Sequence, residues 1–295
     1  MTRIEENSLN RSLSRQTVGR ALAHNLTATA GLIVLLLFLV ITIFADRIAP
    51  YDPLKTSNET LQSPSQKFVF GTDDLGRDIF SGVIYGARTS ILIGVSVTLF
   101  GGLIGVFVGS VAGYAGGLFD DLLMRLTELF LIPPQFFIAL IVAALFGSSL
   151  INLILILAFT NWTTTARLVR AEVLSIKERP FIEASRAMGA SPLRILLHDI
   201  LPNAFPVIIT KMILTIGGVI LLEAGLSFIG IGDAKHISWG YMLHNGQHFI
   251  RDAWWMIAFP SFALALLVLA LNVVGDAVNT SLNPKARSAY FDKPV

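Results

Sequence analysis

Six apolar stretches, each long enough to cross a lipid bilayer, restrict what this chain can fold into. A helix needs about 20 apolar residues to span the hydrocarbon core. The stretches cover residues 26–48, 86–112, 118–146, 150–172, 203–231 and 254–281. The sequence therefore predicts an all-α polytopic membrane protein with six transmembrane helices.

Composition supports this interpretation. Charged residues make up 14% of the chain, whereas soluble proteins carry about 25%. The chain has no cysteine, which excludes disulfides and thiolate metal sites. Its first apolar stretch is longer than the apolar part of a secretory signal, about 7 to 15 residues, and no small-residue cleavage site follows it. We therefore expect it to be a retained span.

The distribution of basic residues predicts the orientation. Four arginines lie in residues 1–25 and six basic residues lie between Arg167 and Arg194, whereas residues 49–85 hold more acidic than basic side chains. Cytoplasmic loops carry an excess of Lys and Arg, so both termini are expected in the cytoplasm. The expected organisation is a cytoplasmic tail, a first helix with a long outer loop, a five-helix core with an inner loop at about 173–202, and a second cytoplasmic tail. These parts cover residues 1–25, 26–85, 86–282 and 283–295.

Two features modify the predicted spans. Gly101, Gly105, Gly109 and Gly113 recur at a spacing that lets another helix approach closely. That helix could belong to this chain, to another subunit or to a moving contact. Pro133 and Pro134 interrupt the third span, and proline removes backbone donors and bends helices. The bend could be static or a hinge.

The stretch EASRAMGASPLRILLHDILPN, residues 183–203, interrupts the apolar pattern on the inner side. A short amphipathic helix is expected from Pro180 to Met188. Gly189 can take the left-handed conformation that ends a helix. Ser191 and Pro192 are typical of the start of the next one, which should lead to Leu201-Pro202 and the fifth span. Its small, alanine-rich face favours docking on protein over lying on lipid.

Four motifs in order resemble one family. E-A-S-x-x-x-G followed by I-L-P resembles the EAA loop of ABC importer permeases. Residues 71–91 (GTDDLGRDIFSGVIYGARTSI), 225–243 (GLSFIGIG and SWGYML) and 272–284 (NVVGDAVNTSLNP) resemble segments of dipeptide, oligopeptide and nickel importers. The extra first span is typical of the C-type permease of each pair. The resemblance covers residues 26 to 284.

The resemblance implies the type I importer fold and a coupling role for the inner loop. In this family the loop enters a groove of a cytoplasmic ATPase. The motif positions here are Glu183, Ala184 and Gly189, with Ser191 and Pro192 shaping the exit; Ser185 replaces a frequent second alanine. The implied partners are a homologous B-type permease, two ABC ATPases and an extracytoplasmic binding protein, in the lipid of a prokaryotic inner membrane. No cofactor, metal or nucleic acid is expected in this chain, since ATP and magnesium belong to the partner subunits.

Other polar residues in the spans and outer loops have competing interpretations. Glu223 lies in an apolar run, where an acid is costly, and could be a structural acid or part of a gate. Lys211 could extend its stem to the inner interface. The outer-loop group Asp73, Asp74, Gly76, Arg77 and Asp78 lacks EF-hand spacing and favours a turn paired through arginine. The outer-loop histidines His236, His244 and His248 lack the glutamate of HExxH, which favours structural or surface roles.

Together with the resemblance, these features indicate uptake of a substrate, with peptides as the first expectation. Nickel, metal chelates, glutathione and sugars use the same family, and selectivity belongs largely to the binding protein. A membrane enzyme is disfavoured because GLSFIG is not G-x-S-x-G and no histidine falls inside a span. A stand-alone channel would not explain the inner loop.

Overall fold

Every named element of the described chain is helical. The computed structural model describes residues 26–233 and 235–282, so the predicted tails at 1–25 and 283–295 lie outside the described residues. An isolated bridge between Thr72 and Asp78 is the β-type pairing found in this part. The elements are α2 (Leu26–Ile43), α3 (Ala45–Ile48), α4 (Ile79–Ala115), α5 (Gly117–Leu131), α6 (Gln135–Phe146), α7 (Leu150–Lys177), α8 (Pro180–Ala187), α9 (Pro192–Arg194), η1 (Ile195–Ile200), α10 (Leu201–Phe228), α11 (Trp239–Gly246), η2 (Gln247–Phe249) and α12 (Trp255–Leu282).

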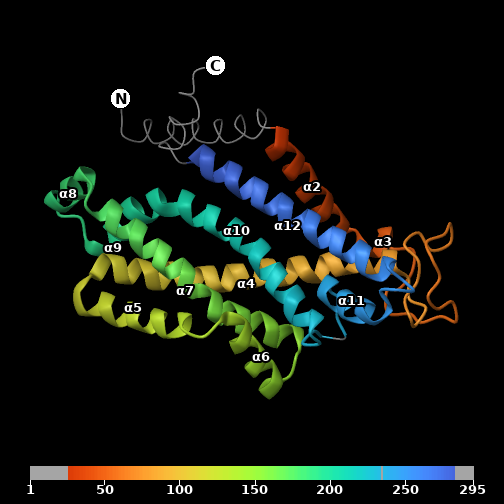
Figure 1. The fold of residues 1–295 in the computed structure, drawn as a ribbon. Coiled ribbons are helices and arrows are strands. Elements are labelled where there is room, and N and C mark those ends of the chain that lie inside the picture. Colours follow the sequence, from red (N-terminus) through yellow and green to blue (C-terminus); the bar gives the residue numbers. More distant parts are fainter. Residues whose placement is uncertain (1–25, 234, 283–295) are drawn as a thin grey trace.

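The long helices form a bundle with two distinct ends. In Figure 1, α2 and α12 run side by side, and α4, α7 and α10 run along the bundle beneath them. The short helix α8 lies at one end, whereas α3, α11 and the loop before α4 lie at the other. The predicted inner loop and the predicted outer loops are therefore at opposite ends of the bundle.

Four helical stretches of the described chain are long and apolar enough to cross a membrane. They are α2, α4, the continuous stretch Pro192–Phe228 and α12, and the bent pair α5 and α6 would make a fifth. Helix α7 is less apolar because Asn161 and four threonines occupy its middle. The total of six spans stays a prediction.

Two predicted boundaries were wrong. Helix α4 begins at Ile79 rather than at 86, because the Asp78 carboxylate caps it by accepting a hydrogen bond from the Ser81 N–H at 2.8 Å. The first helix does not run unbroken from 26 to 48, since α2 ends at Ile43 and α3 follows. Helix α10 begins at Leu201, close to the predicted start of the fifth span at 203, and follows α9 and η1 without a break. A polar cap, not the end of the apolar run, sets the start of α4.

The third predicted span is two helices. Helices α5 and α6 meet at an angle of 75° across the segment that contains Pro133 and Pro134. Proline cannot donate to the carbonyl one turn back, and Pro134 instead becomes the N-cap of α6. The predicted interruption is confirmed, and it is larger than a simple bend.

The glycines of α4 bring it against α7 of the same chain. A Cβ at Gly105 would lie 2.6 Å from the carbonyl oxygen of Trp162, and one at Gly113 would lie 2.9 Å from that of Arg170. Gly101 and Gly109 likewise face backbone carbonyls of α7. Of the partners left open by the spacing, the structure selects packing within the chain.

The largest apolar core joins the bundle to its outer end. Trp239 of α11 is fully buried, stacks edge-on against Phe38 of α2 at 5.7 Å between ring centroids, and donates from Nε1 to the carbonyl of Val83 at 3.0 Å. Met256 of α12 and Ile220 of α10 are part of the same cluster. Helix α11 is therefore anchored in the bundle and does not lie free on the surface.

Candidate functional site

The way in which helix α8 begins and ends explains the proline and the glycine in the sequence of the inner loop. Pro180 occupies the first turn, where its missing N–H costs nothing. At the other end the N–H of Gly189 donates to the carbonyl of Arg186 at 2.9 Å, and that of Ala190 to the carbonyl of Ser185 at 3.1 Å. This pair of bonds is a Schellman motif. The predicted short helix and its glycine stop are confirmed.

Gly189 is required for the conformation of its backbone rather than for space. Its φ is +79°, and a Cβ at this position would meet no atom within 4 Å. Side chains with a Cβ rarely adopt this left-handed conformation. The chain turns sharply here because residue 189 is glycine.

One side of α8 packs on the chain's own bundle. Ile182 is fully buried and Ser185 is 6% exposed. Ile182 belongs to a cluster with Val173 of α7 and Ile195 of η1. Ser185, which replaces a frequent alanine of the family motif, therefore faces inward, and small size at this position serves internal packing.

The other side of α8 is open. Met188 is 66% exposed, and both Ala184 and Ala187 are exposed. The exposed residues of the loop are Phe181, Glu183, Ala184, Arg186, Ala187, Met188, Gly189, Ser191 and Pro192. We call this surface the elbow face. Five of the six predicted coupling residues contribute to it, and Ser185 does not.

The path from the elbow into the membrane is one continuous helix. Ser191 is the N-cap of α9 and accepts from the N–H of Arg194 at 3.4 Å, as the sequence predicts. Helices α9, η1 and α10 then follow without a break. The π-helical segment η1 precedes Pro202 and Pro206, which lack the N–H of a regular helix. A displacement of the elbow would be carried directly into α10.

An ion pair and a hydrogen bond that the sequence did not reveal hold the inner end together. Arg170 of α7 makes a two-pronged contact with Asp120 of α5, at 2.5 and 2.6 Å. Lys177 Nζ donates to the carbonyl of Tyr114, at the end of α4, at 2.6 Å. The sequence shows acidic and basic residues on the same predicted side of the membrane, but it does not show which of them pair. These contacts tie α4, α5 and α7 together beside the elbow.

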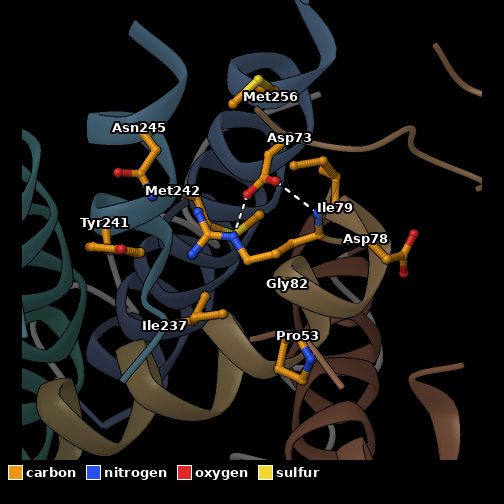
Figure 2. Close-up of a pocket in the computed structure, with 11 residues that line it drawn as sticks. Pro53, Asp73, Asp78, Ile79, Gly82, Ile237, Tyr241, Met242, Asn245 and Met256 are labelled. Atoms are coloured by element: carbon orange, nitrogen blue, oxygen red, sulfur yellow. Dashed lines mark hydrogen bonds and ion pairs between the residues drawn. The ribbon is translucent and has the colours of Figure 1, made fainter. Parts of the chain in front are cut away.

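The outer turn before α4 is held by arginine, as predicted. Arg77 Nε donates to Asp73 Oδ2 at 2.5 Å, and Asp73 Oδ1 accepts from the N–H of Arg77 at 2.8 Å. Figure 2 shows Asp73, Tyr241 and Met242 around the cavity that Arg77 also lines. Burial opposes the charged form, but Asp73 outweighs it and raises the pKa of Arg77 above its ordinary value. The cavity beside this pair holds about 20 Å³, enough for roughly one water molecule.

Asp233 joins the last outer loop to the start of α7. Its carboxylate accepts from the N–H of Leu150 at 3.0 Å and from the N–H of Lys235 at 2.9 Å, and contacts His236 Nδ1 at 2.9 Å. Burial would raise the pKa of Asp233, but these hydrogen bonds lower it below the ordinary value. In residues 26–233 and 235–282 no three histidines or acids are grouped so that they could hold a metal ion.

Glu223 links two helices near the outer end. It is fully buried, and its Oε1 accepts from Ser227 Oγ at 2.6 Å and from Ser238 Oγ at 2.8 Å. Ser238 is also the N-cap of α11. This contact fits the structural interpretation of Glu223, and a gating role for it or for Pro133 and Pro134 stays a prediction.

Replacing Glu223 by alanine is expected to lower the free energy of unfolding by about 1–3 kcal/mol, because two buried hydroxyl donors lose their acceptor. Glu223→Gln keeps an acceptor oxygen and should cost less. Thermal unfolding of the two variants in detergent tests this. Equal destabilisation by Gln and Ala would show that the serine contacts are unimportant.

Comparison with known proteins places this architecture in one family. Residues 105–288 match the binding-protein-dependent transport system inner membrane component family, and residues 14–64 match the N-terminal transmembrane domain of oligopeptide transport permease C. A chain of the inward-facing MetNI methionine ABC transporter superposes with a TM-score of 0.53 at 19% identity, covering 70% of this chain and 98% of that one. The structural likeness supports the fold.

Sequence relatives extend over almost the whole chain. The dipeptide transport system permease protein DppC of Bacillus subtilis is 39% identical over 275 residues, covering 92% of this chain and 86% of that protein. The oligopeptide permease OppC of the same organism is 36% identical, covering 89% and 87%, and the di/tripeptide permease DppC of Pseudomonas aeruginosa is 35% identical, covering 92% of each. This chain therefore belongs to the family of binding-protein-dependent transport system inner membrane components, as a multi-pass C-type ABC permease subunit of the bacterial inner membrane.

Proposed function

We propose that this chain is the C-type permease of an ATP-driven importer that takes up peptides. The relatives named above are named as dipeptide, di/tripeptide or oligopeptide permeases, and they match 89–92% of this chain. No contact in the described chain favours nickel, a metal chelate, glutathione or a sugar over a peptide. Peptides are therefore the substrate class that the resemblance supports best.

The proposed assembly divides the work among subunits. This chain and a homologous B-type permease form the pathway, and two cytoplasmic ABC ATPases bind ATP and magnesium. A binding protein delivers the cargo to the outer end, at loops 49–85 and 233–253. The chain has no G-x-x-x-x-G-K-[ST] motif, so its own role is conduction and coupling without covalent chemistry.

The exposed elbow face is the observation that supports coupling. It presents Phe181, Ala184 and Met188 on a helix whose opposite side is fixed to the bundle by Ile182. Apolar side chains on one side of a short helix suit a groove on a partner protein. The continuous helix from Pro192 to Phe228 then turns a movement of the ATPases into a tilt of α10.

Cross-linking of neighbouring positions tests this contact. The chain contains no cysteine, so a single introduced cysteine reports on one site. In the assembled transporter, Ala184→Cys should form a disulfide with a cysteine placed in the ATPase groove, and the yield should change with ATP. Ser185→Cys, the adjacent position on the buried side, should react poorly.

Two results would count against the proposal. Equal cross-linking from positions 184 and 185 would mean that α8 does not dock by its exposed side. Absence of ATP-dependent peptide uptake in vesicles that hold the complete assembly and its loaded binding protein would reject the transport assignment itself.

A further inference from the structure

A polar groove lies between helices α6, α7 and α10, outside the elbow and the outer turn. Its volume is about 400 Å³, within the range of small-molecule sites. Its polar lining consists of Gln135, Asn161, Thr164, Lys211 and Thr215. A Cβ at Gly218, another lining residue, would meet no atom within 4 Å, so the groove is open on this side.

Lys211 is the cation of this groove and has no counter-charge. The expectation from sequence was a stem reaching the inner interface, but the side chain is half-buried and lines the groove. No carboxylate in the described part of the chain forms an ion pair with its ammonium group. An unpaired ammonium inside a membrane-spanning bundle is costly and marks a pathway or a partner contact.

The start of α6 adds positive potential at the same place. Gln135 is the first residue of α6, directly after the break at Pro133 and Pro134. Its side-chain amide donates to Thr160 Oγ1 of α7 at 2.8 Å and so fixes this helix end. The amide N–H groups of Gln135 and Phe136 have no acceptor within the described residues. The N-terminus of a broken membrane helix favours an anionic group of a substrate.

Thr215 and three apolar side chains complete the lining of the groove. Thr215 lies one helical turn after Lys211 on the same face of α10, and its Oγ1 is buried with no hydrogen-bond partner among the described residues. Leu214, Val219 and Leu222 supply an apolar lining. The groove thus combines one cation, a helix N-terminus and polar side chains beside an apolar wall.

We infer that this groove receives the carboxylate of the cargo during its passage, with Lys211 as the residue that selects for it. The inference rests on the proposed transport function, because it assigns the groove to the pathway. The ligand chemistry is a carboxylate on a small molecule with apolar parts, as at the C-terminus of a peptide. The competing occupant of Lys211 is an acidic side chain of the partner permease.

Charge-selective thiol labelling tests the inference in the complete transporter. Thr164 is exposed and lines the groove. The reaction rates of Thr164→Cys with two methanethiosulfonate reagents, one with an anionic sulfonate and one with a cationic trimethylammonium group, therefore report the electrostatic potential of the groove. We expect Lys211→Met to lower the ratio of anionic to cationic labelling rates by about tenfold, because the lost positive charge acts in opposite directions on two reagents that differ by two charges. Lys211→Arg should keep the ratio, and a reporter at the exposed Ser63 should not respond.

Protection by cargo tests the carboxylate. A dipeptide with a free C-terminus should slow labelling of Thr164→Cys, and the same peptide as its amide should not; Lys211→Met should abolish the protection. An unchanged labelling ratio in Lys211→Met, or no anion preference in the parent because a partner acid neutralises Lys211, would overturn the inference. Peptide uptake by the parent transporter is measured separately. If uptake is normal and either of these two labelling results is found, the groove assignment is rejected and the proposed transport function is not.

Discussion

Gly189→Pro is expected to lower ATP-driven uptake by at least about tenfold, because proline cannot adopt the backbone that this position requires. The φ of Gly189 is +79°, whereas proline is restricted to about −65°. The substitution also removes the N–H that donates to Arg186 at 2.9 Å. Helix α8 would then leave the bundle at a different angle, and the elbow face would no longer fit its partner.

The matched control is Gly189→Asn. A Cβ at this position meets nothing within 4 Å, so any side chain has room and only the backbone conformation is tested. Asparagine tolerates the left-handed region and keeps the N–H. Initial uptake rates and the amount of ATPase that copurifies should be close to the parent for Asn and strongly reduced for Pro. Similar behaviour of the two variants would show that the elbow angle does not matter for coupling.

Gly109→Val is expected to destabilise the fold by more than about 3 kcal/mol, because the helices α4 and α7 touch through backbone atoms at this point. A Cβ at Gly109 would overlap the carbonyl oxygen of Ala166 and lie 2.9 Å from the Cβ of Val169. Neither group is the end of a flexible side chain, so the two helices would have to separate along their shared length. We expect a large loss of folded protein in the membrane.

Gly218→Val is the control for the general effect of valine in a helix, as distinct from the loss of the α4–α7 contact. Gly218 lies inside α10, and its Cβ position is open, so the change should shift the free energy of unfolding by no more than about 1 kcal/mol. Thermal unfolding in detergent and the yield of folded protein measure both variants. Comparable losses of stability for Gly109→Val and Gly218→Val would contradict the assignment of the α4 glycines to the α4–α7 contact.

Local chemistry explains why the elbow could be predicted from the sequence. Gly189 ends α8 and Ser191 caps α9, and both effects act within a few residues of the chain. The interruption at Pro133 and Pro134 follows from the absence of a backbone donor. Features of this kind depend on the nearest neighbours in sequence, and the structure has them where the sequence indicated.

Contacts between distant helices could not be predicted in the same way. Asp120 and Arg170 are 50 residues apart, and their pairing depends on which faces of α5 and α7 meet. Ser185 looked like a surface position of the coupling motif, yet it is buried on the chain's own bundle. The direction of a side chain around a short helix depends on what the helix packs against, which a single sequence does not contain.

The sequence by itself determined the membrane class and the elbow, because apolar length, basic loops and helix caps act through local physical chemistry, and it indicated the family through motifs that resemble those of known permeases. Only the tertiary structure decided that the glycines of α4 face α7, that Glu223 joins α10 to α11, and that Lys211 enters a polar groove beside the start of α6. In each case the sequence shows the residue type, but it does not show which residue or helix it contacts. Contacts between distant residues are set by the rotation and register of each helix in the packed bundle, and these depend on all of the helices together.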